Sequence, residues 1–331
     1  MATLEATAAI KGDTRAGSQV LSLFANPLTA RILDAHTEGP LRLTVLHDQI
    51  NWAPPTTMRA AVNNLCSVGA LEKAARGDGR PAGTTTLTSA GEEMIEVGHT
   101  VDRWLSLCPT GPIAPNTEEA KSAIKALAGG WNTMLMRALA HRPFTLTSLA
   151  KLISDVSYPS LERRLVSMRA AGQIEAVEAD DRGTPYMVTE WTRRAVAPLA
   201  VAGRCERRHL PELTAPITDL EVEASFMLTM PLAPLPKTAS GALMLAVQTG
   251  GDESQKLGRN LVGVTVELEH GEILSSAPRI NQNPPTWALG TAGDWLDVVI
   301  DGNFTELRFG GARPQLAADM VRGLHFALFD R

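Results

Sequence analysis

The sequence predicts an α+β protein: two tandem copies of a helical module with a hairpin, then a smaller α+β domain with an antiparallel sheet. Two observations predict this class. A sequence pattern recurs at a constant offset of 103 residues, and apolar residues alternate with period two after residue 218. We expect a flexible tail at 1–17, the modules at 18–108 and 121–210, linkers at 109–120 and 211–218, and the last domain at 219–331.

The repeat is clearest around residues 60 and 160. In each copy, apolar residues stand at i, i+4 and i+7, and a glycine follows: Met58, Val62, Leu65 and Gly69, then Leu161, Leu165, Met168 and Gly172. The same offset relates Ile32 to Leu135, Leu46 to Leu149, and Ile50 to Ile153. A register kept over about forty positions indicates two copies of one supersecondary unit.

Each copy predicts the same order of elements. A first helix (19–36 and 131–141) precedes a short second helix (43–50 and 146–154) and the long helix that ends at the glycine. A strand pair split by a Gly/Pro/charge cluster predicts a hairpin. Thr88 and Thr189 then suit the N-cap of a closing helix. This order is that of a winged helix-turn-helix.

The outer face of the long helix is the candidate DNA-reading surface, because readout of the major groove needs a packed inner face and an outer face of donors. The second copy places there Ser157, Tyr158, Ser160, Arg163, Arg164 and Ser167. The first copy offers Thr56, Thr57, Arg59 and Asn63, with small neutral residues at Ala60, Ala61 and Asn64. The alternatives are an ordinary solvated face in the second copy and a purely structural first copy.

The hairpin tips carry Arg76, Arg80 and Arg182, which could reach phosphates or the minor groove. Ordinary solubility of the loops is the alternative interpretation. Acidic neighbours such as Asp78 and Asp180 weaken the electrostatic argument.

The second copy resembles the HxlR-type winged-helix regulators of bacteria. The resemblance rests on Gly130-Trp131, Val156-Ser157, Arg164-Leu165, Gly172 and Tyr186-Met-Val-Thr189. The first copy resembles a diverged version that lacks the Trp and the Arg-Leu. The resemblance covers residues 18–210 and implies operator binding, with Ser157 and Arg164 at or near DNA. Family members usually bind as homodimers, so one chain with two copies is expected to act as a pseudo-dimer or to form a homodimer.

Charge is distributed unevenly. The net charge is −5, but residues 134–210 carry 12 Lys and Arg against 8 Asp and Glu. Residues 211–331 carry 8 against 15. This distribution is expected if only the middle third faces phosphate. The start of the chain lacks the layout of a signal peptide, and three widely spaced cysteines suit a reducing compartment, so we expect a cytoplasmic location and no membrane span.

The last third predicts strands around Val222–Leu228, Leu243–Val247 and Val262–Leu268, and helices at about 292–300 and 315–329. The stretch from Trp287 to Met320 resembles the sterol-carrier-protein-like domain. That resemblance implies an apolar ligand site lined by Phe226, Trp287, Trp295, Phe304, Phe309 and Met320. The alternative is that these side chains simply fill a core.

Catalysis has little support in the sequence. It contains no Gly-rich phosphate loop, no HExxH, no GxSxG and no paired His and carboxylate at metal spacing. We therefore expect neither enzymatic activity nor a metal or cofactor. The sequence predicts a DNA-binding regulator that responds to a hydrophobic small-molecule effector. Two alternatives stay open: a protein that sequesters hydrophobic compounds without binding DNA, and a protein-interaction module.

Overall fold

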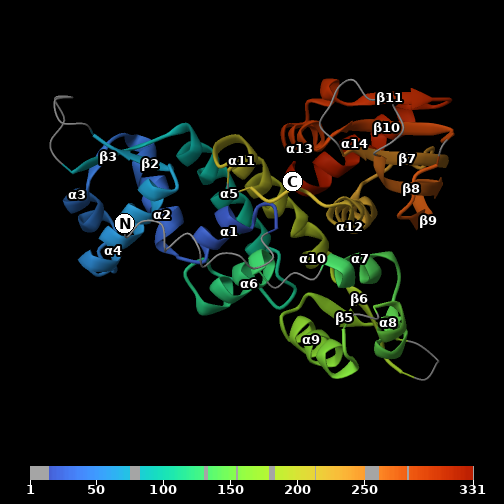
Figure 1. Cartoon of the computed structure of the whole chain (residues 1–331), viewed down its shortest axis with the longest axis horizontal. Coiled ribbons are helices and arrows are strands. Elements are labelled where there is room, and N and C mark those ends of the chain that lie inside the picture. Colours follow the sequence, from blue (N-terminus) through green and yellow to red (C-terminus); the bar gives the residue numbers. More distant parts are fainter. Residues whose placement is uncertain are drawn as a thin grey trace. The chain divides into compact units, whose positions relative to one another are not determined.

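The computed structural model describes residues 15–74, 83–129, 133–153, 156–178, 183–212, 214–249, 261–281 and 283–330. The chain is an α+β protein (Figure 1). It divides into two compact units. The N-terminal unit holds residues 1–130 and 198–216, and the C-terminal unit holds 131–197 and 217–331. These units do not follow the expected boundaries, because the second repeat belongs to the same unit as the last third of the chain.

The first repeat lies within the N-terminal unit. It combines helices with a sheet of three short strands in the order β1-β3-β2, with both pairs antiparallel. The elements are α2 (Leu28–Ala35), η1 (His36–Glu38), β1 (Leu41–Arg42), α3 (Leu43–Gln49), α4 (Pro55–Ser67), β2 (Leu71–Lys73), β3 (Thr84–Leu87) and α5 (Ser89–Ser106).

The second repeat lies within the C-terminal unit and has the same order of elements. They are α7 (Thr133–His141), β4 (Phe144–Thr145), α8 (Leu146–Leu152), α9 (Tyr158–Ala170), β5 (Ile174–Ala176), β6 (Pro185–Val188) and α10 (Glu190–Arg194). The sheet order β4-β6-β5 repeats that of the first copy. The bounds of β4, α8, α9 and β5 are those of β1, α3, α4 and β2 shifted by 103 residues. The predicted repeat is therefore confirmed in three dimensions.

Local signals explain these bounds. Gly69 and Gly172 adopt positive φ angles of 77° and 69° directly after the long helices, as predicted. Thr88 and Thr189 cap α5 and α10 by accepting hydrogen bonds from Gly91 N and Thr192 N. The expected single helix at 19–36 is wrong. The chain forms α1 (Ser18–Phe24) and α2 instead, because Pro27 has no N–H and its ring blocks the preceding turn of a continuous helix.

Two pairs of equivalent helices meet in the N-terminal unit. Helix α6 (Glu118–Gly129) spans the positions 103 residues after α1, and the two helices pack on each other. Helix α11 (Val196–His209), whose first two residues belong to the other unit, spans the positions 103 residues after 93–106 of α5. From α11, Arg204 pairs with both Glu93 and Glu96 of α5, at 3.1 and 2.9 Å.

Glu206 of α11 is the carboxylate that caps α1. It is 1% exposed and accepts hydrogen bonds from the backbone N–H groups of Gly17, Gln19 and Val20 at 2.7 to 2.9 Å. These are the donors that a helix start leaves without intrahelical partners. Burial raises the pKa of Glu206, and the three donated hydrogen bonds oppose that rise.

The last third of the chain forms a five-stranded sheet in the order β11-β10-β7-β8-β9. Its strands are β7 (Gly241–Gln248), β8 (Leu261–Glu269), β9 (Glu272–Ala277), β10 (Thr286–Thr291) and β11 (Arg308–Gly311). Three of the four pairs are antiparallel, whereas β7 and β10 run parallel. The sheet packs with α12 (Asp219–Thr229), α13 (Ala292–Asp301) and α14 (Pro314–Phe329), and two short helical turns, η2 (Met230–Leu232) and η3 (Phe304–Glu306), accompany them.

The strand expected at Val222–Leu228 is wrong, because this segment is the helix α12. Thr218 and Glu221 form a reciprocal capping box at its start. Val222, Ala224, Phe226, Met227 and Leu228 are all buried. Burial on several sides of the helix hides the 3.6-residue period, and the remaining pattern resembles strand alternation. Among the described residues, no helix is long and apolar enough to cross a membrane.

The second repeat and the sheet domain share one hydrophobic core. Leu135 and Leu165 of the repeat belong to the same buried cluster as Leu245 of the sheet and Met320 of α14. Helices α7 and α12 pack along each other, and Arg137 forms an ion pair with Glu223 across them. The expected linker at 211–218 therefore does not separate two independent cores.

Two consecutive arginines of α10 tie this core together. Arg193 is 8% exposed and donates to the carbonyls of Ala140 in α7 and of Met227 and Leu228 in α12, at 3.1 to 3.2 Å. Arg194 donates to the carbonyl of Ala327 in α14 at 2.8 Å. These carbonyls lie in the last turns of their helices, where no intrahelical donor is available.

Candidate nucleic-acid interface

Helix α9 separates its residues as the sequence predicts. Leu161, Leu165 and Met168 are buried. The expected reading residues Ser157, Tyr158, Arg163, Arg164 and Ser167 are exposed, and Ser160 is half-buried. Pro159 lies in the first turn of α9, where its missing N–H costs no intrahelical bond. The side chains of the candidate set thus lie together along one open face.

Two arginines supply the positive charge of this face. Arg163 donates from Nε to the carbonyl of Pro159 at 3.3 Å, which leaves its terminal nitrogens available. Within the described part of the chain, no carboxylate forms an ion pair with Arg163 or Arg164. Tyr158 at the leading end is 48% exposed. The face therefore offers planar cationic donors and hydroxyls of the kind that contact phosphates and base edges.

Helix α4 presents a less charged face in the first repeat. Thr56, Thr57, Arg59 and Asn63 are exposed as expected. Ala61, assigned to the outer face, is 6% exposed and belongs to the packed side, so this assignment is wrong. The reason is a wider buried face on α4, which packs against α2 as well as β2. The equivalent position in α9 is the exposed Arg164.

Asn63 has a fixed partner. Lys73 of β2 donates from Nζ to Asn63 Oδ1 at 3.0 Å. This bond occupies one acceptor site of the amide and leaves its two N–H donors free to point outward. In the same repeat, Trp52 in the turn before α4 is 57% exposed. The sequence reasoning did not select Trp52, although a Trp in a short polar turn is itself an unusual signal.

The hairpin arginines Arg76, Arg80 and Arg182 lie outside the described residues, so their predicted roles stay predictions. Cys66 of α4 is half-buried. Burial raises the pKa of its thiol, and the nearby Lys73 opposes that rise. A raised thiol pKa disfavours the reactive thiolate and suits a packing role.

A second basic surface, which the sequence reasoning missed, lies beside α8. A hollow of about 550 Å³ is lined by Arg142, Thr145, Ser148 and Lys151 together with apolar and backbone groups of β4 and β6. Arg142 lies 4.8 Å from the ring centre of Phe144, which holds the guanidinium in place. Two cations and two hydroxyls in one hollow are suited to a phosphate group.

The first repeat lacks this combination of two cations and two hydroxyls. The positions 103 residues before Arg142, Thr145, Ser148 and Lys151 are Gly39, Arg42, Val45 and Asp48. The clustering of Arg and Lys in residues 134–210 was the available sequence signal, but only the fold brings positions 142 and 151 to one hollow. Of the two repeats, the second therefore holds two cations and two hydroxyls at these positions, whereas the first holds one cation and one carboxylate.

The six residues expected to line an apolar ligand site do not form one group. Phe226, Trp295 and Met320 are buried in the main core. Phe226 contacts Trp295 edge-to-face at 4.9 Å, and the Trp295 indole donates to Ala246 O at 2.8 Å. Phe304 and Phe309 pack partly buried against the same core. Trp287 belongs to a separate cluster with Met244 and Leu289.

No model of a known protein family matches the sequence, and no curated protein is significantly similar to it. The functional assignment therefore depends on the residues and geometry described above. The class they define is an α+β chain with a duplicated helix-and-hairpin module. One copy of that module carries a cationic outer helix face.

Proposed function

We propose that this protein is a DNA-binding regulator whose two repeats are winged helix-turn-helix modules. The single observation that carries the proposal is the outer face of α9. It brings Ser157, Tyr158, Arg163, Arg164 and Ser167 to solvent while the opposite side of the helix is buried. A helix with this division can enter the major groove without exposing its apolar side.

The second repeat is proposed as the anchor. Its hollow with Arg142 and Lys151 adds a phosphate site next to α8, the helix that precedes the reading helix in the chain. The first repeat offers mainly neutral donors, so it contributes register or modest specificity. Attraction to phosphate dominates affinity for DNA, so the more basic module supplies most of the binding free energy.

The internal pairing of equivalent helices supports a pseudo-dimer. Helix α1 packs on its own repeat equivalent α6, and α5 pairs with α11 through Arg204. In a symmetric homodimer, the same surface of each subunit meets its copy. Here one chain supplies both copies, so we propose that a monomer carries two reading heads.

The test is binding of double-stranded genomic fragments by the full chain, measured at several salt concentrations. Arg163→Ala combined with Arg164→Ala is expected to weaken binding. It should also reduce the magnitude of the salt slope, the slope of log binding constant against log salt concentration, by about 1 to 2. Arg142→Ala combined with Lys151→Ala is expected to reduce it similarly. Lys237→Ala combined with Arg279→Ala removes two exposed charges from the last third and serves as the matched control.

The possible results of this test distinguish the proposal from its alternatives. An unchanged slope in the Arg163/Arg164 variant would remove these residues from the interface. Equal losses in the control variant would indicate nonspecific charge effects. Absence of binding by the parent protein at low salt would reject the proposal and favour the interaction-module alternative, which the exposed Tyr158, Val166 and Leu152 of the second repeat also suit.

Response to a hydrophobic effector in the last third is a further part of the proposal. The shared core and the α10 arginines support it, because a change of packing around α12 or α14 would reach the second repeat directly. Binding of an effector must favour one of two arrangements to act in this way.

A further inference from the structure

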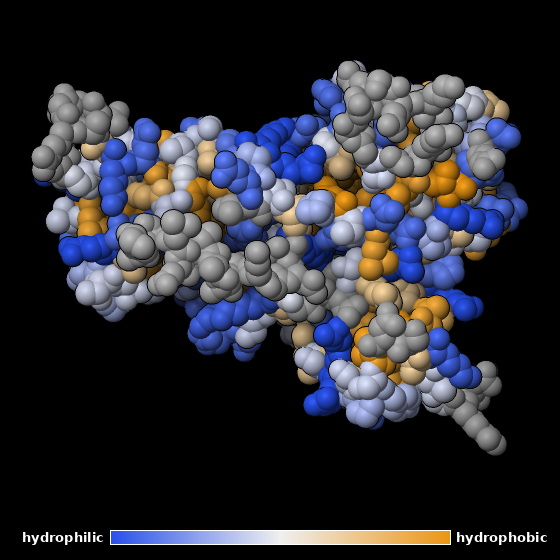
Figure 2. All heavy atoms as spheres, in the orientation of Figure 1, coloured by the Kyte–Doolittle hydropathy of each residue, from blue (hydrophilic) through white to orange (hydrophobic). Residues whose placement is uncertain are grey.

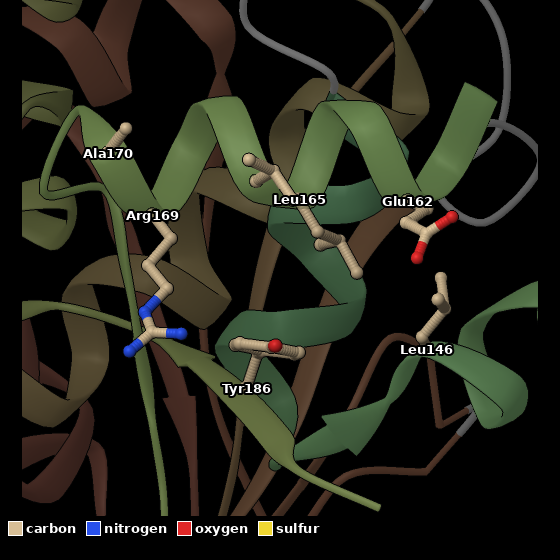
Figure 3. Close-up of a pocket in the computed structure, with 7 residues that line it drawn as sticks. Leu146, Glu162, Leu165, Arg169, Ala170 and Tyr186 are labelled. Carbon is tan, nitrogen blue, oxygen red and sulfur yellow. The ribbon is translucent and has the colours of Figure 1, made fainter. Parts of the chain in front are cut away.

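The second repeat contains a groove between its reading helix and its sheet. The groove has a volume of about 450 Å³ and lies between α9, the start of α8 and β6. Leu146, Leu165, Val166, Ala170 and Tyr186 provide its apolar lining. Figure 3 shows Leu165 and Arg169 extending from α9 toward the side of Tyr186, while Glu162 lies near Leu146 at the other end.

The groove carries opposite charges at its two ends. Glu162 and Arg169 are seven residues apart on α9, which places them on one face and separates them by about 10 Å along the helix axis. Among the described residues, neither Arg169 nor Glu162 has a hydrogen-bond or ion-pair partner that would neutralise its charge. Arg169 and Tyr186 both line the groove, and Figure 3 shows the Arg169 side chain extending toward the side where Tyr186 lies. A cation next to an apolar floor is thus open to a ligand.

Surface exposure of the apolar lining also needs an explanation. Val166 is 65% exposed, although it is a β-branched apolar residue on a helix with polar neighbours. Figure 2 shows hydrophobic residues at the surface of the second repeat with hydrophilic residues around them. An apolar strip bordered by charge is typical of a binding surface.

The first repeat provides an internal comparison. The positions equivalent to Glu162, Val166 and Arg169 are Arg59, Asn63 and Cys66. The strand position equivalent to Tyr186 is Thr85, whose hydroxyl is bonded to the buried His36 at 2.8 Å. The charge polarity and the aromatic floor therefore occur only in the second repeat, and the shared fold does not require them.

We propose that this groove binds an organic carboxylate with an apolar body. The carboxylate meets the Arg169 guanidinium, the apolar body lies over Tyr186, Leu165 and Val166, and Glu162 disfavours the reverse orientation by repulsion. The occupant lies against the helix that carries Arg163 and Arg164. Its effect on DNA affinity rests on the proposed function, whereas its binding does not.

The experiment measures binding of 4-phenylbutyrate to the full chain in the absence of DNA, by calorimetry. Saturable binding at one site is expected. Arg169→Gln should weaken it by about tenfold or more, since a charge-assisted bond is lost. 4-Phenylbutanol, which has the same body without the charge, should bind the parent protein at least about tenfold more weakly for the same reason. Ala170→Trp should fill the groove and abolish binding, and circular dichroism verifies that both variants fold.

Arg163→Gln is the matched control, because it removes an arginine from the same helix on its outer face. It should leave 4-phenylbutyrate binding unchanged while weakening DNA binding, so failure of the ligand proposal and failure of the DNA proposal are distinguishable. Absence of saturable binding, or equal affinity in Arg169→Gln, would overturn the inference. The inference would also be overturned if the parent protein did not bind 4-phenylbutyrate and Ala170→Trp changed the oligomeric state. That result would assign the groove to contact with a second copy.

Discussion

Removal of Arg193 should destabilise the C-terminal unit more than removal of any exposed arginine. Its guanidinium is the donor for three carbonyls at the ends of α7 and α12. Burial lowers the Arg193 pKa to about 10, a shift that the nearby Glu190 opposes, so the group is still charged at neutral pH. Arg193→Ala leaves the three carbonyls without this donor in the interior.

The expected loss follows from these bonds. A buried polar group that loses its partner costs about 1 to 3 kcal/mol. Three such groups, partly rescued by relaxation or by water, give a loss of about 3 to 5 kcal/mol. Arg193→Met keeps the packing of the stem and should lose nearly as much. Arg193→Lys keeps the charge, but its single ammonium nitrogen cannot reach the three acceptors that the guanidinium reaches, so an intermediate loss is expected.

The measurement is urea unfolding followed by tryptophan fluorescence, where Trp191 and Trp295 report on the C-terminal unit. Arg194→Ala is the comparison, because Arg194 donates to the carbonyl of Ala327 and pairs with Glu190. It should lose about 1 to 2 kcal/mol. A loss below about 1 kcal/mol in Arg193→Ala, or full stability in Arg193→Lys, would refute the view that donors to helix ends hold this core together.

Three further predictions concern the repeats and their pairing. His36 should make the N-terminal unit less stable at acidic pH. Burial lowers the pKa of His36 below 6.5, although its hydrogen bond to Ile32 O opposes this shift, so the unfolded chain binds more protons and stability falls as pH drops below about 6.5. The urea midpoints of the parent at pH 8 and 5.5 should therefore differ more than those of His36→Gln. Glu206→Ala removes the acceptor of three N–H groups at the start of α1 and should cost about 2 to 4 kcal/mol, with a smaller loss in Glu206→Gln; equal stability of Glu206→Ala would contradict the capping role. Gly172→Ala forces a side chain into a φ of 69° and should lower the unfolding free energy by about 1 to 2 kcal/mol, whereas Ala171→Gly at the preceding position should cost less.

The repeat was predictable because its signals are local. The spacing of Met58, Val62 and Leu65, the glycine after each long helix and the capping threonines each act within a few residues. The exposed set on α9 followed from the same periodicity. The burial of Ala61 did not follow from periodicity, because it depends on how closely α4 packs against another helix. A small residue is compatible with either face of a helix.

Segments buried on several sides misled the sequence reasoning. In α12, apolar residues occupy successive positions, and both a strand and a helix can bury them. Of the six residues expected to line a ligand site, Trp287 lies apart from the other five for a related reason. Aromatic side chains in neighbouring elements can point to either side of a sheet, and Trp287 belongs to a different cluster from Phe226.

The amino-acid sequence by itself determined the duplicated module, the C-terminal ends of its long helices and the division of α9 into a buried and an exposed side, because these depend on periodicity and on backbone preferences of single residues. Only the tertiary structure decided which elements share a core. Nothing in the local sequence indicates partners for Arg193 and Arg194, yet they donate to carbonyls of three helices that are distant in the chain. The hollow with Arg142 and Lys151 arises in the same way. Such partners meet through long-range packing, whose free energy depends on contacts between segments far apart in the chain.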